Sequence, residues 1–344
     1  MRYRIFGNTG LRVSALALGT GNFGKGWGYG SDQDEAHQIY TSYRASGGNF
    51  IDTADQYQFG QSETMLSDFI ASERDDIVLA TKFSLGDSPD AGLQRSGNSR
   101  KAMMRSVEAS LQRLKTDRID LLWVHMPDGV TPIDEIARGL DDLVRAGKIL
   151  YSGLSDFPAW RVATAATLTD LRGWSPISAV QLEYSLVERS AERELLPMSA
   201  GFNLGTVAWS PLGGGLLTGK YRRGETGRAQ GLGAVIHGES DARKTATVDA
   251  VLAIADDIGI SPGQVAIAWV LAKGVLPIIG PRTHEQLTDN LSSLEITLSP
   301  EQVKQLDEVS AISMGFPHEV VAASASALAG GKQDLIDGPI RSIK

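Results

Sequence analysis

Residues 119–154, IDLLWVHMPDGVTPIDEIARGLDDLVRAGKILYSGL, hold a complete strand–helix–strand pattern. An apolar run at 119–124 ends at His125, and a helical pattern at 132–146 ends before Gly147, a residue type that often terminates helices. A second apolar run follows at 149–154. Two such runs on either side of one helix predict parallel strands that are buried on both faces and joined by a right-handed crossover.

The same alternation continues through the rest of the chain. Similar apolar, β-rich runs lie at 15–18, 49–51, 77–80, 179–182, 204–208 and 275–279, which makes eight in all. Eight β-α units predict a closed (β/α)8 barrel, the TIM barrel of the α/β class, formed as a single domain over residues 1–344. The alternative is an open doubly wound sheet, which usually has fewer strands and a dinucleotide-binding fingerprint after its first strand.

Three segments are additions to this alternation. Residues 3–5 and 13–14 flank a Gly-Asn-Thr-Gly turn and predict an N-terminal hairpin that covers the floor of the barrel. A long loop after strand 7, at 213–238, is rich in Gly, Arg and Lys, and long loops in compact domains are usually functional. The C-terminal tail at 311–344 has weak periodicity, and we expect it to wrap the barrel or to close over a site.

Composition excludes several classes of function. The formal net charge is -8 and no basic run stands out, which argues against a sequence-independent grip on nucleic acid. The chain has no cysteine, so disulfides, a thiolate nucleophile and Cys-ligated metals are excluded. Because the N-terminus lacks an apolar leader and no stretch reaches about 18 apolar residues, we expect a cytoplasmic protein without a membrane partner. The sequence leaves the oligomeric state open.

Two glycine-rich stretches look like nucleotide-binding motifs. Residues 19–24, GTGNFG, match the Rossmann pattern G-x-G-x-x-G, but a helical pattern resumes only after Ser31, so no helix N-terminus faces a pyrophosphate there. Residues 214–219 with Lys220 match most of a P-loop, but Tyr221 replaces the hydroxyl residue that binds Mg²⁺. We interpret the first as a loop at a strand end and the second as a phosphate cradle of another kind.

Polar residues close three of the apolar runs, at the barrel face where catalytic groups lie. The second run ends in Asp52, the third in Lys82 and the fourth in His125, and Tyr57 follows Asp52 on the same loop. A lysine held by an aspartate favours phenolate character in a nearby tyrosine, which then protonates a carbonyl oxygen that the histidine orients. Each residue alone is more often a cap, a solvated charge or a hydrogen-bonded group, but the four together predict a proton-transfer site.

A hydrolytic metal centre is the other common use of Asp, Lys and His on a barrel. The five histidines form no H-x-H or H-x-x-x-H pair, which are the spacings that place two ligands on one metal. We therefore expect no metal site.

Several segments share their order and spacing with one known family. They are Asp52-Thr53-Ala54-Asp55-Gln56-Tyr57, Gly60-Gln61-Ser62-Glu63, Thr81-Lys82, Asp120-Leu121-Leu122-Trp123-Val124-His125, Gly147-Lys148, Gly153-Leu154-Ser155 and Gly280-Pro281-Arg282-Thr283. This set of motifs, within residues 3–290, resembles the aldo-keto reductases. Within that family, it is most similar to the longer-chain bacterial type. The resemblance implies an oxidoreductase that reduces aldehydes or ketones to alcohols by hydride transfer from NADPH. It also implies that Asp52, Tyr57, Lys82 and His125 form the catalytic tetrad, with Tyr57 as general acid. The alternative is a cofactor-binding regulatory subunit with little turnover.

The resemblance further implies a set of cofactor-binding residues. Gly19, Thr20, Gly21 and Asp52 correspond to positions beneath the cofactor, Ser155 and Gln181 to those that hold the nicotinamide carboxamide, and Trp209 to the aromatic on which the ring stacks. Ser210, Leu212, Gly214 and Lys220 correspond to the loop over the pyrophosphate, and Gly280, Arg282, Thr283, Gln286, Asp289 and Asn290 to the adenosine end, with Arg228 assisting. Arg282 is the expected partner of the ribose 2′-phosphate, which favours NADPH over NADH.

One position departs from the family pattern. Asp156 stands where the family usually has Asn after the serine. An amide both donates and accepts hydrogen bonds, whereas an ionised carboxylate only accepts them. We therefore expect the carboxamide to be held through its NH₂ group, or the Asp156 side chain to turn elsewhere.

The substrate is expected to be a small carbonyl compound, hydrophobic or aromatic rather than a free sugar. Apolar side chains on or near the strand-end loops are candidates to line its pocket. They are Trp27, Tyr29, Phe83, Trp123 and Met126, and Phe316 and His318 in the tail are candidates to close it.

Overall fold

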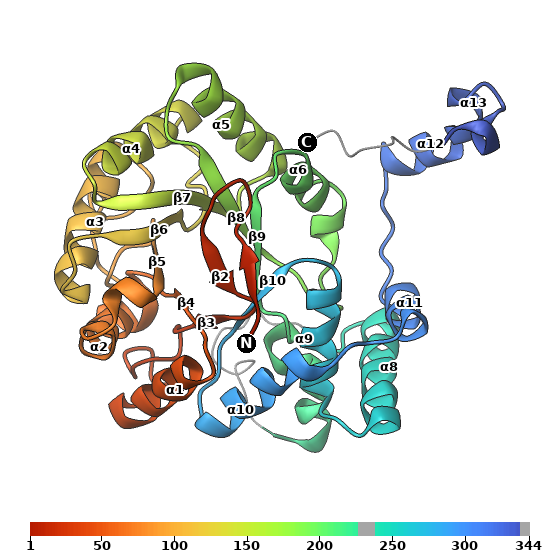
Figure 1. The fold of residues 1–344 in the computed structure, drawn as a ribbon, viewed down its shortest axis with the longest axis horizontal. Helices are drawn as coiled ribbons and strands as arrows, with labels where there is room; N and C mark the ends of the chain where they lie inside the picture. Colours follow the sequence, from red (N-terminus) through yellow and green to blue (C-terminus); the bar gives the residue numbers. More distant parts are fainter. Residues whose placement is uncertain (226–237, 338–344) are drawn as a thin grey trace.

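The computed structural model describes residues 1–225 and 238–337. Eight parallel strands form a closed barrel in the order β10-β3-β4-β5-β6-β7-β8-β9 (Figure 1). They are β3 (Ala17–Gly19), β4 (Phe50–Asp52), β5 (Val78–Phe83), β6 (Ile119–Val124), β7 (Ile149–Ser155), β8 (Ile177–Glu183), β9 (Gly205–Trp209) and β10 (Leu276–Ile279). The barrel closes where Ile278 pairs with Ala17. The predicted TIM barrel is confirmed, and the open doubly wound alternative is wrong.

Helices surround the barrel (Figure 1). They are α1 (Gln33–Ala45), α2 (Gln61–Ile70), α3 (Arg100–Leu114), α4 (Ile133–Arg145), α5 (Ala159–Arg172), α6 (Leu195–Gly201), α8 (Ala242–Ile258), α9 (Pro262–Ala272), α10 (His284–Ser292) and α11 (Pro300–Val309). The sequence sets many of their ends. Side chains of Asp32, Ser99 and Ser261 accept a hydrogen bond from the first turn of the helix that follows each, while Gly173 and Gly259 end helices in the left-handed conformation.

Short 3₁₀ helices complete the connections. They are η1 (Tyr57–Gly60), η2 (Arg74–Asp76), η3 (Ser190–Glu192), η4 (Gly213–Thr218), η5 (Lys220–Arg223), η7 (Ser293–Glu295) and η8 (Gln333–Leu335). The elements η4 and η5 lie in the described part of the predicted long loop after the seventh barrel strand. Residues 226–237 of that loop, including Arg228, lie outside the described residues.

Side chains that point into the barrel form one buried cluster. Because successive strand residues point to opposite faces, every second residue belongs to this interior and the others pack under the helices. The interior includes Phe50, Val78, Ala80, Leu121, Trp123, Ala179, Val207, Leu276 and Ile278. The outward residues Ile51 and Leu79 pack with the helices instead. The same alternation decides which residues reach the mouth of the barrel.

The predicted hairpin closes one end of the barrel. Strands β1 (Tyr3–Ile5) and β2 (Arg12–Ser14) pair in antiparallel fashion and lie across the barrel end (Figure 1). Phe6, which follows β1, is buried and meets Phe50 edge to face, with ring centroids 5.5 Å apart. A Cβ atom at Gly205 would lie only 2.8 Å from the Phe6 ring, so a glycine is needed where the hairpin segment meets β9. The hairpin therefore covers the floor, as predicted.

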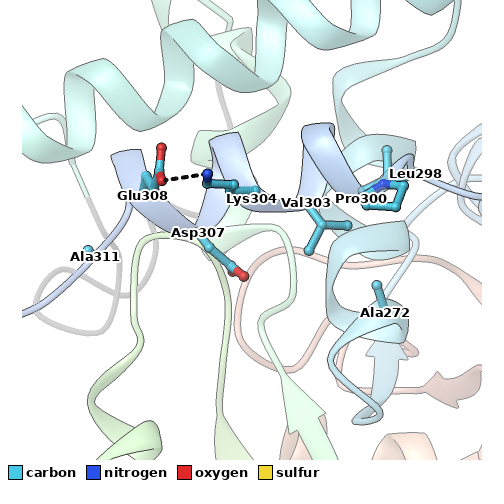
Figure 2. Close-up of a pocket in the computed structure, with 8 residues that line it drawn as sticks. All are labelled: Ala272, Leu298, Pro300, Val303, Lys304, Asp307, Glu308 and Ala311. Atoms are coloured by element: carbon cyan, nitrogen blue, oxygen red, sulfur yellow. Dashed lines mark ion pairs between the residues drawn. The ribbon is translucent and has the colours of Figure 1, made fainter. Parts of the chain in front are cut away.

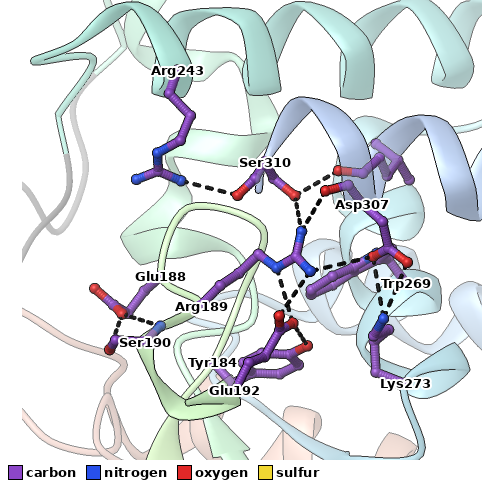
Figure 3. Close-up of polar contacts among 11 residues, drawn as sticks. Tyr184, Glu188, Arg189, Ser190, Glu192, Arg243, Trp269, Lys273, Asp307 and Ser310 are labelled. Carbon is purple, nitrogen blue, oxygen red and sulfur yellow. Dashed lines mark hydrogen bonds and ion pairs between the residues drawn. The ribbon is translucent and has the colours of Figure 1, made fainter. Parts of the chain in front are cut away.

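A charged network joins the loop after β8 to the last barrel helix (Figure 3). Arg189 pairs with Glu192 at 2.8 Å and donates hydrogen bonds to the main-chain oxygen of Asp307 and to Ser310 Oγ, at 2.7 and 2.8 Å. Its guanidinium also lies 5.4 Å from the centre of the Trp269 ring. Since Ser310 directly follows α11, this network fixes the chain as far as the point where the tail begins.

The tail does not close over the barrel. Its helices α12 (His318–Ala323) and α13 (Ala325–Leu328) stand away from the main body (Figure 1), and the described part of the tail, 311–337, contains no buried residue. Phe316 is 87% exposed, and His318 pairs with Glu194 at 2.9 Å. The expectation that Phe316 and His318 close a substrate pocket is therefore wrong for this structure. The weak periodicity of the segment gives it no apolar face large enough to bind the barrel.

A groove on the outer surface lies beside the root of the tail (Figure 2). Its volume is about 650 Å³, and it is lined by Ala272, Leu298, Pro300, Val303, Lys304, Asp307, Glu308 and Ala311. These residues come from the end of α9, from α11 and from the segments next to it. Because none of them is a predicted site residue, this groove is separate from the candidate active site.

No single helix within the described ranges is long and apolar enough to cross a membrane. The pair α8 and α9 would pass together by length and composition, but the two helices are bent by 103° at their junction.

The contact between Gly153 and Trp123 generates a prediction about stability. A Cβ at Gly153 would lie 2.3 Å from the Trp123 ring, which is fully buried. Gly153→Ala is therefore expected to overpack the barrel and to lower the free energy of unfolding by about 1–3 kcal/mol, measured by urea denaturation. Gly201→Ala is the control, because a Cβ there meets nothing within 4 Å. Equal urea midpoints for the two variants would contradict this account.

Candidate active site

Asp52 and Lys82 meet at the mouth of the barrel. Asp52 ends β4 opposite Ala80, so Lys82 lies two residues further along β5 on the same inner face. The Lys82 ammonium pairs with Asp52 Oδ1 and donates a hydrogen bond to the Thr53 carbonyl oxygen at 3.1 Å. Gln181 Nε2 donates to the other oxygen of Asp52 at 2.9 Å. The ion pair is about 1% exposed, yet both of its members have partners.

Opposing effects act on the pKa of Lys82. Burial lowers this pKa, because a charged ammonium loses its hydration, but the negative charge of Asp52 and the Tyr57 phenol raise it by more. The net pKa lies above its ordinary value. Lys82 therefore carries its positive charge at neutral pH.

Tyr57 lies against this pair on the loop that follows β4. Lys82 Nζ donates a hydrogen bond to the Tyr57 hydroxyl oxygen at 3.1 Å and lies 4.7 Å from the centre of its ring. The next residue, Gln58, adopts a φ of 53°, and its side-chain amide donates to Gly21 O and accepts from Trp27 N, each at 2.9 Å. Gln58 thus ties the Tyr57 loop to the loop that follows β3. The sequence did not identify this residue, because its contacts depend on a left-handed backbone that a residue other than glycine does not signal.

His125 completes the set that the sequence predicted. It follows β6 and places its ring edge to face with Tyr57, at a centroid distance of 5.9 Å. Burial, and secondarily the positive charge of Lys82, lower the pKa of His125 to about 3. Its Nδ1 atom is buried without a hydrogen-bond partner. The imidazole is therefore neutral at physiological pH, and the structure brings all four tetrad residues together.

Three further predicted residues point inward from neighbouring strands. Ser155 ends β7, Gln181 lies on β8 and Trp209 ends β9. The Ser155 hydroxyl is buried and has no hydrogen-bond partner. Gln181 donates its NH₂ group to Asp52, which leaves its carbonyl oxygen as an acceptor. A donor, an acceptor and a flat aromatic side chain therefore occur together beside the tetrad.

Asp156, the departure from the family pattern, has a partner within the protein. Its φ is 58°, and its Oδ1 atom accepts a hydrogen bond from Trp209 Nε1 at 2.9 Å. In this structure the side chain therefore turns toward Trp209. Ordinary sequence patterns do not predict this contact, because it depends on the left-handed backbone at residue 156.

The loop after β3 contributes through its backbone. Gly19 must lack a side chain, since a Cβ would lie 2.5 Å from Ile278 Cγ2. Gly21 lies beside the Tyr57 ring, and a Cβ there would meet the ring at an ordinary contact distance of 3.6 Å. Thr20 differs from the other two. Its buried hydroxyl accepts a hydrogen bond from Ser62 at 2.8 Å, so its side chain is used in packing.

The loops after β9 and β10 bring two cations, Lys220 and Arg282, close together. Burial, followed by repulsion from Arg282, lowers the pKa of Lys220. Two cations that repel each other in this way suit an anionic ligand. Among the described residues, the Arg282 guanidinium forms no hydrogen bond or ion pair.

The remaining predicted cofactor residues vary in how free their side chains are. Ser210 and Gly214 both have positive φ. Ser210 Oγ accepts a hydrogen bond from Gly214 N, which fixes the turn between them. Leu212 is half-buried against the core. At the adenosine end, the Thr283 side chain caps α10, and the Gln286 side chain accepts a hydrogen bond from Arg282 N. Gly280 is exposed, whereas Asn290 is buried. Asp289 accepts from Ser261 and Gln264, so it joins α10 to α9. Its carboxylate is already used within the protein.

A buried layer of charge behind the tetrad was missed from the sequence. Glu63, fully buried on α2, accepts from Thr81 Oγ1 at 2.6 Å and pairs with Arg113 at 2.7 Å. Burial, with repulsion from Glu63, raises the pKa of Asp55 to about 7. This layer supports β5 directly behind Lys82. The segment Gly60-Gln61-Ser62-Glu63 is one of the family motifs, but nothing in it identifies Arg113 on α3 as the partner of Glu63.

Aromatic rings centred on Trp27 form an aromatic wall beside Tyr57. The Trp27 ring lies 6.0 Å from that of Tyr57, 6.1 Å from Tyr29 and 6.4 Å from Phe59. Phe59 was not expected here. Two expected lining residues are elsewhere, because Phe83 points outward under the helices and Trp123 lies deeper in the barrel interior. Met126 follows His125 and is half-buried.

In the described part of the chain, no group of three or more His, Asp or Glu side chains is arranged to hold a metal ion.

Comparison with known proteins assigns the fold and site to a family. The sequence model of the Aldo/keto reductase family matches residues 15–311. The chain belongs to this family and is an oxidoreductase whose relatives generally use NAD(P)H.

The relatives include proteins from fungi and bacteria. The chain is 37% identical to "Aldo-keto reductase ausK" of Aspergillus calidoustus, over 93% of this chain and 85% of the relative. It is 35% identical to "Putative aryl-alcohol dehydrogenase AAD14" of Saccharomyces cerevisiae, over 93% and 89% of the two chains. It is 38% identical to "Uncharacterized oxidoreductase YrpG" of Bacillus subtilis, over 90% and 96%.

The burial of His125 generates a prediction about its charge. Because its pKa is lowered to about 3, its imidazole should stay neutral from about pH 8 down to about pH 5, a range in which exposed histidines titrate near pH 6.5. The nitrogen chemical shifts of the side chain, measured by NMR and assigned with His125→Asn, would report this. A His125 midpoint between pH 6 and 7 would contradict the burial argument.

Proposed function

We propose that the protein reduces aldehydes or ketones to alcohols with NADPH, with Tyr57 as general acid. The observation that carries the proposal is the contact between Lys82 and Tyr57. Lys82 donates to the phenol oxygen at 3.1 Å, so the phenol proton is free to be donated to a substrate. The family membership supports an oxidoreductase activity.

Each tetrad residue has a separate role in this proposal. The Lys82 charge stabilises the negative charge that develops on Tyr57 as its proton leaves, and Asp52 keeps Lys82 charged and in position. His125, being neutral, offers one N–H donor to a carbonyl oxygen without adding positive charge. The bound dinucleotide supplies the hydride.

The residues beside the tetrad fit a nicotinamide dinucleotide. A carboxamide needs both a donor and an acceptor, and the orphaned Ser155 hydroxyl and the free Gln181 oxygen supply them. Trp209 offers a ring face for stacking. At the other end, Lys220 and Arg282 would bind phosphate groups. We propose NADPH over NADH because Arg282 has no acidic partner within the described ranges and suits a 2′-phosphate.

The aromatic wall supports a hydrophobic or aromatic substrate. Trp27 lies against Tyr57, and Tyr29 and Phe59 pack against Trp27. These rings offer apolar surface in place of the many hydrogen-bonding groups that a free sugar requires. One relative is described as a putative aryl-alcohol dehydrogenase, which agrees with this preference.

A regulatory subunit that binds the cofactor without turnover is the second candidate. The arrangement of the tetrad favours an enzyme, because such a subunit needs neither a charged Lys82 nor its contact with Tyr57. The test is to mix the protein with NADPH and activated aldehydes such as 4-nitrobenzaldehyde and to follow NADPH absorbance. No loss of absorbance with any aldehyde would favour the regulatory subunit. Efficient turnover of aldoses alone would overturn the substrate preference.

Tyr57→Phe tests the general acid. We expect turnover to fall by about 10² to 10⁴-fold with little change in NADPH affinity, because proton donation matters only in the transition state. The control is Tyr3→Phe, which removes a phenol from the distant hairpin. If Tyr57→Phe turns over at nearly the wild-type rate, another group, His125 first, supplies the proton.

Arg282→Ala tests cofactor choice. Loss of one charge-assisted contact to the 2′-phosphate should weaken NADPH binding by about 1.5–3 kcal/mol, roughly tenfold or more, and leave NADH nearly unchanged. Titration calorimetry with both dinucleotides would measure this, with Arg172→Ala as an exposed arginine control. Equal losses for NADPH and NADH would show that Arg282 supports the fold or the pyrophosphate instead.

A further inference from the structure

Asp156 is held against two of the residues proposed for the nicotinamide end. Its main-chain N donates to Gln181 O at 3.0 Å, and its carboxyl accepts from the Trp209 indole at 2.9 Å. The left-handed backbone at φ 58° is uncommon for a residue other than glycine, so the surrounding contacts fix this orientation. Although Asp156 is exposed to solvent, these contacts hold its carboxyl group in one orientation beside Trp209.

The groups around Asp156 determine its charge. Asp156 is exposed to solvent, but loss of hydration to the residues packed around its carboxyl raises the pKa of that group to about 6, and Glu183 on β8 raises it as well. The hydrogen bond from Trp209 on β9 and the positive charge of Lys82 on β5 lower it. Ser155 lies close enough to lower it too, but its hydroxyl forms no hydrogen bond of acceptable geometry. Asp156 is therefore neutral in mild acid and mostly ionised at neutral pH.

We propose that Asp156 sets the relative affinity of the site for the two redox forms of the dinucleotide, and that its ionised carboxylate favours NADP⁺ over NADPH. The inference rests on the proposed function, because it assumes that the nicotinamide ring binds beside Trp209 and Gln181.

The physical reason is the charge of the ring. The nicotinamide ring is positively charged in NADP⁺ and neutral in NADPH, while the rest of the molecule is the same. A nearby carboxylate stabilises only the positive ring, so it acts on the difference between the two affinities. An amide at this position would carry no such charge. Lys82 opposes the effect, but Asp52 neutralises much of its field.

This arrangement makes the relative affinity for the two forms of the dinucleotide depend on pH. As Asp156 ionises, the bound pair shifts toward the oxidised dinucleotide, so the site holds NADP⁺, which forms when a carbonyl is reduced, more tightly than a site with a neutral side chain would. In mild acid, the protonated carboxyl removes this bias and instead adds a hydrogen-bond donor beside Ser155. The preference for NADP⁺ at higher pH follows from the negative charge of the ionised Asp156 carboxylate.

Titration calorimetry tests the proposal through binding alone. The Kd values for NADPH and NADP⁺ would be measured from about pH 5.5 to about pH 8 with wild type and with Asp156→Asn. For wild type, the ratio of Kd for NADPH to Kd for NADP⁺ should rise with pH by on the order of tenfold. For Asp156→Asn, which keeps an acceptor for the indole, the ratio should stay flat. The 2′-phosphate also titrates near pH 6, but it is common to both forms and cancels in the ratio.

Two further variants identify the titrating group. Glu183→Gln should keep the pH dependence of the ratio, with its midpoint at lower pH, because one repelling charge is gone. Asp170→Asn on the exposed end of α5 should behave as wild type.

The outcomes separate the inference from the proposed function. If neither dinucleotide binds the wild-type protein, the proposed function fails. If both bind but the wild-type ratio is independent of pH, or Asp156→Asn keeps the dependence, the Asp156 inference fails and the proposed function stands. Loss of the dependence in Glu183→Gln alone would transfer the role to Glu183 and overturn the inference.

Discussion

The buried ion pair between Lys82 and Asp52 is the interaction around which the mouth of the barrel is organised. A charged ammonium that is about 1% exposed is tolerated only with a counter-charge and a full set of hydrogen bonds. Asp52 supplies the charge, the Thr53 carbonyl and the Tyr57 phenol accept the remaining hydrogen bonds, and Gln181 satisfies the second oxygen of Asp52. Meeting these requirements brings together β4, β5, β8 and the loop containing Tyr57. The site therefore has this arrangement because the buried charge of Lys82 needs a counter-charge and hydrogen-bond partners.

Much of this arrangement could be predicted from the sequence because barrel strands have a side-chain period of two. Once Asp52, Lys82 and His125 are recognised as the residues that end apolar runs, a closed parallel sheet places them at one end of the barrel. The same rule accounts for an error in the expected pocket lining. Phe83 is one residue beyond Lys82 and must point to the opposite face, under the helices.

Contacts that depend on loop conformation could not be predicted in this way. The hydrogen bond between Trp209 and Asp156 requires a positive φ at residue 156, and the hydrogen bond from Gln58 to Gly21 O requires a positive φ at residue 58. Neither residue is a glycine, so the sequence carries no local signal for these conformations. The expected closure by the tail failed for a different reason: that segment has small residues and no apolar period, so no docking face could be defined for it.

The network around Arg189 has a consequence for how this chain can vary. It ends the packed body at Ser310, and none of the described residues beyond that point is buried. Replacement of residues among 311–337 would thus leave the barrel core and the tetrad untouched. The Arg189 contacts thus set the boundary between the part of the chain that the barrel core constrains and an extension that is held only by surface contacts such as that of His318 with Glu194.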